Sequence, residues 1–127
     1  MSFGWHSGIA SGWGMNVNGY PGSVLWGKMH HHYGALTQAN TDNLRYTFDS
    51  VKGTSGSGVY AYWSNTGLRR IYGVNNVQYW LSGDAKLSTD NYIAGHTAPS
   101  WNQAVRITSS KFVALCGWIN APAALGC

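Results

Sequence analysis

The sequence Gly-Thr-Ser-Gly-Ser-Gly-Val at residues 53–59 sets a serine between glycines, directly before apolar residues that read as a strand. A nucleophilic serine needs a turn that keeps its Oγ clear of the backbone and aims nearby N–H groups at the charge forming on an attacked carbonyl. Glycine permits the backbone geometry of such a turn. Ser55 is therefore a candidate nucleophile, with the N–H groups of Gly53 and Ser55 as a candidate oxyanion hole. Serine–glycine runs also form plain hairpin turns or linkers, so the heptapeptide alone favours neither interpretation.

The composition around this stretch predicts one globular, all-β domain. The chain has 127 residues, of which 44% are hydrophobic and only 9% are charged. That length can bury a core, and that apolar content is typical of globular rather than disordered chains. Seventeen glycines, eight tyrosines and seven tryptophans fit strands of aromatic and β-branched residues separated by glycine turns.

The charge pattern predicts neither nucleic acid nor membrane as a partner. The net charge of +4 comes from eight basic and four acidic residues. The basic residues are scattered except for the pair Arg69-Arg70, which indicates a solvated surface rather than a nucleic-acid-binding stripe. No stretch has the length of a transmembrane span, and the N-terminal residues lack the pattern of a signal peptide.

The cysteines and histidines give weak signals. Cys116 and Cys127 could close one short disulfide loop, which we favour slightly, or could be one buried and one terminal thiol. The run His30-His31-His32 would alternate faces on a strand, and no further ligand has a zinc-like spacing to it. We therefore expect a polar strand there and no metal site.

Turn signals and period-two patterns divide the chain into short elements. A hairpin turn is expected at residues 64–67, and residues 82–103 read mostly as polar loop. Ser109 and Ser110 can cap a short amphipathic helix that packs on the sheet. Strands are expected at residues 15–20, 24–33, 44–48, 59–63, 68–74 and 104–107, and residues 75–80 are expected to continue in extended form from the strand at 68–74. The apolar face of the helix comprises Phe112, Leu115, Cys116 and Ile119.

Several segments together resemble the second half of a chymotrypsin-fold serine protease of the bacterial glutamyl-endopeptidase branch. The matching segments are GYPG at 19–22, Trp26, YTFDS at 46–50, GTSGSGVY at 53–60, IYGV at 71–74, VRIT at 105–108 and the closing helix. Their order and spacing cover nearly the whole chain. The resemblance implies that residues 1–127 form one domain, a six-stranded antiparallel barrel with a C-terminal helix, and that the protein is secreted.

The same resemblance implies roles for individual residues. Ser55 would be the nucleophile, and the amides of Gly53 and Ser55 would form the oxyanion hole. Asp49 and Ser50 would form the floor of the pocket for the side chain that precedes the cleaved bond. No cofactor or metal is implied. A bound peptide would pair by β-addition with the strand Asn75, Asn76, Val77 and Gln78.

Two departures from the family pattern limit these expectations. Asn75 stands where the family has a glutamate-binding histidine, while Asp49-Ser50 also resembles the pocket floor of trypsin-like enzymes, so the preferred charge stays open. The family's catalytic His and Asp belong to a first barrel that this sequence lacks. We therefore expect the chain alone to be inactive or nearly so, and to need a first barrel in cis or in trans, or to self-associate.

Two other functions fit the same sequence. The many aromatic residues and few charges suit a non-enzymatic β-domain that binds carbohydrate or peptide. A catalytically dead protease homologue acting as an interaction module would lack the same His and Asp as a truncated enzyme. The sequence does not separate these alternatives.

Overall fold

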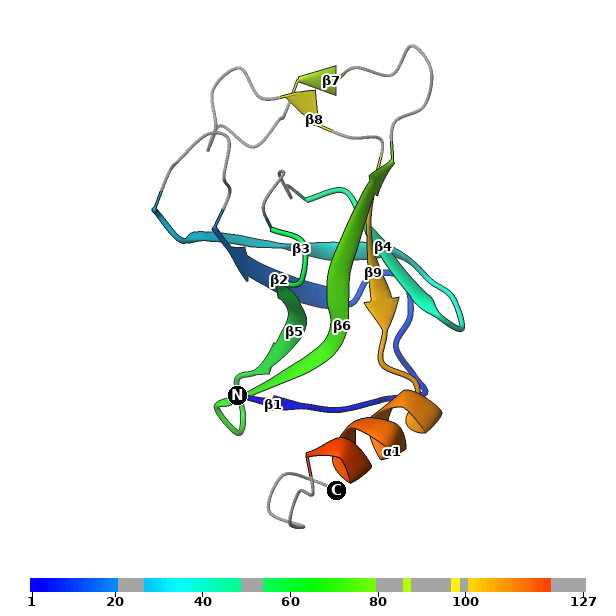
Figure 1. Ribbon diagram of the computed structural model, residues 1–127. Coiled ribbons are helices and arrows are strands. Elements are labelled where there is room, and N and C mark those ends of the chain that lie inside the picture. Colours follow the sequence, from blue (N-terminus) through cyan, green and yellow to red (C-terminus); the bar gives the residue numbers. More distant parts are fainter. Residues whose placement is uncertain (21–26, 49–53, 80–85, 88–96, 99–100, 120–127) are drawn as a thin grey trace.

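The computed structural model describes residues 1–20, 27–48, 54–79, 86–87, 97–98 and 101–119, which form a closed six-stranded antiparallel barrel with one C-terminal helix (Figure 1). Around the barrel the strands follow the order β2-β3-β4-β9-β6-β5, and β5 returns to pair with β2. Closure leaves no free lateral edge along the paired part of the sheet. The expected all-β barrel and closing helix are confirmed. The barrel strands are β2 (Gly14–Gly19), β3 (His30–Ala39), β4 (Asn43–Tyr46), β5 (Gly58–Trp63), β6 (Leu68–Tyr79) and β9 (Trp101–Arg106).

Three short strands lie outside the closed ladder. β1 (Ser2–Phe3) pairs in parallel with β6, where Ser2 is opposite Arg70. β7 (Lys86–Leu87) and β8 (Thr97–Ala98) form a separate antiparallel pair. β1 therefore extends the sheet near the start of β6, whereas β9 pairs with β6 only from Gly73 onward.

Some strand boundaries differ from those expected. The strand expected at 24–33 is confirmed only at residues 30–33, which open β3; residues 27–29 are not in a strand, and 24–26 lie outside the described residues. β3 follows Gly27, with φ 75°, and continues to Ala39. The strand expected at 68–74 does continue in extended form, as β6 over Leu68–Tyr79, and it carries a register shift between Asn75 and Val77. Because a bulge bends a strand without ending it, one chain segment serves two stretches of the barrel wall.

The loop expected at 82–103 was wrong at its end, because β9 already begins at Trp101. The polar side chains of Asn102 and Gln103 suggested a loop, yet both are buried. Asn102 Nδ2 donates to the backbone oxygen of Phe48 over 2.8 Å, and Gln103 Nε2 donates to Asn43 Oδ1 over 3.1 Å. Buried amides are tolerated when they are hydrogen-bonded in this way.

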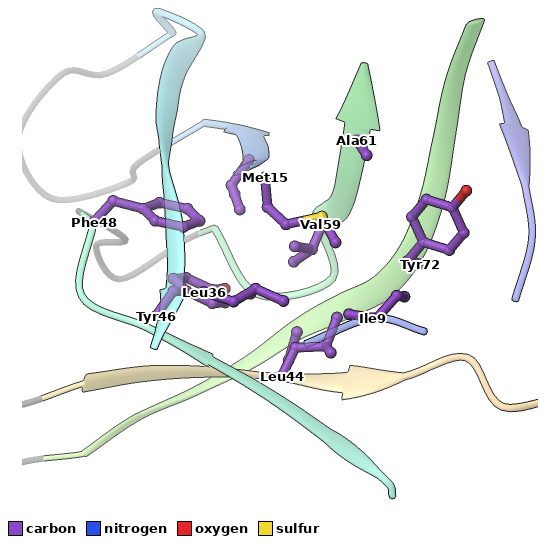
Figure 2. Close-up of a cluster of buried hydrophobic side chains, with 11 residues drawn as sticks. Ile9, Met15, Leu36, Leu44, Tyr46, Phe48, Val59, Ala61 and Tyr72 are labelled. Carbon is purple, nitrogen blue, oxygen red and sulfur yellow. The ribbon is translucent and has the colours of Figure 1, made fainter. Parts of the chain in front are cut away.

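The core fills the inside of the barrel with aliphatic and aromatic side chains from all the walls (Figure 2). On β2 the alternation is clear, because Met15 and Val17 are in the core while Asn16 and Asn18 face the other side. Tyr46 stacks on Phe48 with ring centroids 4.3 Å apart. The core cluster consists of Ile9, Met15, Val17, Leu36, Leu44, Tyr46, Phe48, Val59, Ala61, Tyr72 and Ala104.

The helix α1 (Ser109–Trp118) lies beside β1 at one end of the barrel (Figure 1). Its N-cap is Thr108, not Ser109 or Ser110, because the Thr108 hydroxyl accepts from Lys111 N over 3.4 Å. Phe112 packs edge-on against Phe3 at 5.6 Å. None of its described residues is fully buried, so the helix covers the barrel end only lightly. Among the described residues no helix is long and apolar enough to cross a bilayer.

Candidate functional site

Ser55 occupies the corner of a tight turn that leads into β5. The Ser57 amide donates to the Thr54 backbone oxygen over 3.1 Å, which closes a four-residue β-turn over 54–57. Gly56 is at its third position with φ 86°, a conformation that favours glycine and is typical of a type II turn. Ser55 is exposed, and neither its amide nor its hydroxyl bonds to another described residue. The turn therefore presents the hydroxyl to solvent.

Asn75 of β6 anchors the turn through both its backbone and its side chain. The Gly56 amide donates to the Asn75 oxygen, and the Asn75 amide donates to the Ser57 oxygen, each over 2.8 Å. Asn75 Nδ2 also donates to the backbone oxygen of Thr54 over 3.0 Å and to its Oγ1 over 3.1 Å. The residues on both sides of Ser55 are thus tied to one residue of the barrel wall.

Tyr46 of β4 fixes the orientation of the Asn75 amide. Its hydroxyl donates to Asn75 Oδ1 over 2.5 Å, so the Asn75 NH₂ group must face Thr54. Tyr46 is completely buried and stacked on Phe48. Burial raises the pKa of the Tyr46 phenol well above its ordinary value because the anion would lose its solvation. The phenol therefore remains a neutral donor throughout the physiological range.

The other side of the turn rests against Gly19, the last residue of β2. A Cβ placed on Gly19 would stand 2.7 Å from Ser57 Oγ and 2.8 Å from Thr54 Cγ2. Such distances are far below ordinary contact, so the turn needs the missing side chain at Gly19. The serine turn is accordingly clamped between β2 on one side and β6 on the other.

Beyond Asn75, β6 continues with one lateral side paired and the other without a described partner. Pairing with β5 ends at Gly58 opposite Val74, while pairing with β9 runs from Gly73 to Tyr79. Asn76 is exposed at the register shift. Among the described residues, therefore, residues 76–79 have a strand edge that no other strand occupies, next to the serine turn. Such an edge can accept an extended peptide.

The structure describes some of the predicted site residues and leaves others outside the described ranges. Ser55 and Asn75 are brought together by the turn, and Val77 and Gln78 follow in the same strand, opposite Gln103 and Asn102 of β9. Gly53, Asp49 and Ser50 lie outside the described residues, so the predicted oxyanion hole and pocket floor remain predictions. The backbone and side chain of Asn75 are used by the serine turn, which leaves Asn76 as the first residue of β6 free of that turn.

Among the described residues, no histidine or carboxylate is hydrogen-bonded to Ser55. His30 is paired with Gly19 across β2 and β3, which brings it into the neighbourhood of the turn; it is buried, with its ring stacked on His32 at 6.2 Å. His31 bonds through Nε2 to Asn16 Oδ1 over 2.8 Å. No group of three or more potential metal ligands occurs within the described ranges.

Cys116, on α1, is disulfide-bonded, and the other cysteine of the sequence, Cys127, lies outside the described residues. Sequence reasoning overlooked Thr54 and Tyr46 as parts of the site. Tyr46 opens the segment YTFDS that resembles the protease family, but a tyrosine on a strand gives no sign that its hydroxyl will reach another strand. Tyr46 and Asn75 come together because β9 pairs with both β4 and β6.

No protein-family model matches this sequence, and no curated protein is similar to it.

Proposed function

We propose that Ser55 is the nucleophile of a serine endopeptidase and that this barrel is the half of the enzyme that carries it. The observation that supports this most is the exposed Ser55 hydroxyl at the corner of a turn anchored to β6. The hydroxyl makes no hydrogen bond to a described residue, so it is available to react. Rigid anchoring of a polar, exposed side chain is what nucleophilic catalysis needs, because the reacting atom must hold one position.

The reaction would follow the acyl-enzyme route. Ser55 Oγ attacks the scissile carbonyl while a histidine takes its proton, and a bond forms between Oγ and the carbonyl carbon. The same histidine then gives the proton to the leaving amine as the C–N bond breaks. A water molecule releases the acid and restores the Ser55 hydroxyl. The amides of Gly53 and Ser55 would donate to the oxyanion.

The peptide would lie along the open edge of β6 at residues 76–79. Backbone hydrogen bonds to this edge would align the chain in an extended form next to the serine turn. Since the Asn75 backbone already bonds to Gly56 and Ser57, pairing would begin at Asn76. The substrate's side chain would enter a pocket with Asp49 and Ser50 on its floor, and its preferred charge is left open.

The base and its orienting acid would come from a first barrel, joined in cis or binding in trans. The protease family that the sequence resembles carries its histidine and aspartate in that barrel, and no described histidine or carboxylate is hydrogen-bonded to Ser55. A serine without a base retains little of the rate enhancement of the complete triad. The chain alone is thus expected to be inactive or nearly so, while an active enzyme would be secreted and need no cofactor.

Labelling with a fluorophosphonate probe tests the proposal. The chain is compared with a form that also carries the upstream coding sequence, together with a fluorogenic peptide assay. We expect labelling only with the upstream barrel and its complete loss in Ser55→Ala. The matched control is Ser57→Ala, two residues along the same turn, which should keep the label. Equal labelling of both variants, or none in the longer form, would contradict the proposal.

A further variant asks whether the chain supplies its own base. His30→Gln changes the described histidine that pairs with Gly19 beside the turn. If Ser55 were labelled in the isolated chain and lost its label in His30→Gln, the base would be internal and the need for a first barrel would be refuted. A longer form that folds but never reacts would identify a dead homologue.

A further inference from the structure

We propose that an aromatic groove on the outside of the barrel is a binding site for a neutral oligosaccharide. The groove has a volume of about 610 Å³, which is within the range of small-molecule sites. It opens where β2 and β5 separate, because their pairing covers only Asn16 opposite Tyr60 and Val17 opposite Val59. The lining residues are Trp13, Gly14, Asn16, Tyr33, Tyr62 and Trp63, together with Ala61 and Ser64.

The groove is separate from the serine turn. The turn precedes Gly58 at the start of β5, whereas Trp63 is the last residue of that strand. Five residue steps of extended chain separate the two ends by roughly 16 Å. A ligand in the groove therefore does not depend on Ser55, and this proposal stands or falls independently of the proposed peptidase activity.

Two tryptophans form a corner of the groove. The rings of Trp13 and Trp63 are 5.7 Å apart and nearly perpendicular, at 84°. Trp13 is braced on its other side by His6 at 5.1 Å, and its backbone oxygen accepts from Leu36 N over 2.9 Å. A flat ring can therefore lie on one indole while its edge meets the other.

The tyrosines of the groove are also held in place while remaining accessible. Tyr33 is 67% exposed, and its hydroxyl lies only 2.6 Å from where a Cβ on Gly14 would be. The absence of a side chain at Gly14 thus lets the Tyr33 ring lie over β2. Tyr62 is 50% exposed, with the Arg69 guanidinium 4.9 Å from its ring centroid. Fixed rings lose little freedom on binding.

The polar groups of the groove are neutral. Among the described lining residues none carries a charge, and the Arg69 guanidinium beside the groove is stacked on the ring of Tyr62. The lining therefore suits a neutral ligand better than an ionic one. The Asn16 amide is oriented by Tyr60 O at 3.3 Å and by His31 Nε2 at 2.8 Å, which leaves one N–H and one lone pair. Phenol, indole and hydroxyl groups supply further neutral donors and acceptors.

This combination matches the chemistry of a pyranose. A pyranose ring has an apolar face of C–H groups that stacks on an aromatic ring, and a rim of hydroxyls that seeks neutral hydrogen-bond partners. Aromatic walls with a few fixed polar groups provide both. A peptide would instead rely on strand pairing, for which the edge of β6 at residues 76–79 is better placed.

Titration of the full chain with cellohexaose, xylohexaose, mannohexaose and chitohexaose tests the proposal by calorimetry and tryptophan fluorescence. We expect at least one hexasaccharide to bind, with little dependence on salt because the groove is uncharged. Trp63→Ala should weaken it at least tenfold. The matched control Trp118→Ala, on the helix and 80% exposed, should leave binding unchanged, as should Ser55→Ala.

Tyr33→Ala is a second variant, in case Trp63→Ala fails to fold. Because Tyr33 is largely exposed, this variant should fold, and it too should weaken binding at least tenfold. Failure of all four hexasaccharides to bind would overturn the proposal, as would binding that survives both variants. If no sugar binds, and the chain self-associates in a way that Trp63→Ala abolishes, the groove is instead an interface between copies of the chain. Binding of an unstructured peptide alone would also refute it.

Discussion

The Tyr46 hydroxyl donates to Asn75 Oδ1 over 2.5 Å, and the Asn75 NH₂ group donates in turn to Thr54, the residue before Ser55. A buried phenol on β4 thus determines which way an amide on β6 faces, and that amide determines where the serine turn lies. β9 pairs with both of these strands, so the position of Ser55 depends on the packing of three strands of the barrel and not on the turn alone.

Replacing Asn75 should release the serine turn. Asn75→Ala leaves the buried Tyr46 hydroxyl without its acceptor and removes both hydrogen bonds from the Asn75 amide to Thr54. An unsatisfied buried group costs about 1–3 kcal/mol, and each lost hydrogen bond adds to that cost. We expect a loss of at least about 2 kcal/mol in the free energy of unfolding, measured in urea, and faster hydrogen exchange at the amides of Gly56 and Ser57. Asn76→Ala, at the exposed bulge next to it, is the matched control and should change stability by less than about 0.5 kcal/mol. Unchanged exchange in Asn75→Ala would refute the anchoring role.

The burial of Tyr46 should make stability fall in alkaline solution. Its pKa is raised in the folded state, so above about pH 10 the unfolded chain releases a proton that the folded chain keeps. Stability from this group is therefore complete below pH 10 and declines as the pH rises, by up to about 1.4 kcal/mol per pH unit.

Tyr46→Phe removes this titrating group and is the control. The variant should be less stable near neutral pH, because Asn75 Oδ1 loses its donor, but its stability should decline less steeply above pH 10. Urea unfolding at several pH values between 8 and 11 measures both effects. Equal slopes for the two proteins would show that Tyr46 ionises as readily in the folded state as in the unfolded one.

The barrel could be predicted because its strands carry local signals. A short stretch of sequence is enough to show the alternation on β2, where Met15 and Val17 face the core and Asn16 faces outward. The same holds for the turn between β5 and β6. β9 was placed too late because Asn102 and Gln103 are polar and yet buried, and their partners Phe48 and Asn43 are more than 50 positions away. Burial of that kind depends on tertiary contacts that no local pattern contains.

The candidate site, too, could be predicted from the sequence only in part. Ser55 could be identified because a glycine-flanked serine before a strand is a local pattern, and Gly56 has the positive φ that such a turn requires. The anchoring role of Asn75 could not be predicted, because it depends on Tyr46 from β4 and Thr54 from the turn before β5, both distant in the sequence. The aromatic groove likewise needs β2 and β5 to separate beyond the pair of Asn16 and Tyr60, toward Gly14 of β2, which the sequence does not indicate.

The cap of the C-terminal helix should matter more than the serines that follow it. Thr108→Ala removes the hydroxyl that accepts from Lys111 N and should cost about 1 kcal/mol. Ser109→Ala, at one of the two serines expected to cap the helix, should change stability by less than about 0.5 kcal/mol. Thermal unfolding of both variants decides between the two residues, and a larger loss in Ser109→Ala would reverse the assignment.

A methyl group at Gly19 should push the serine turn away from β2. The added Cβ would stand 2.7 Å from Ser57 Oγ and 2.8 Å from Thr54 Cγ2, so the turn or the strand must move, at a cost of about 1–3 kcal/mol. Ser57→Ala in the same chain removes the nearest atom and should restore part of the loss, whereas the contact with Thr54 persists. Gly117→Ala, where nothing lies within 4 Å of the added atom, is the matched control and should not destabilise. Urea unfolding of the single and double variants gives the coupling energy between positions 19 and 57; a value near zero would mean that the turn does not rest on β2.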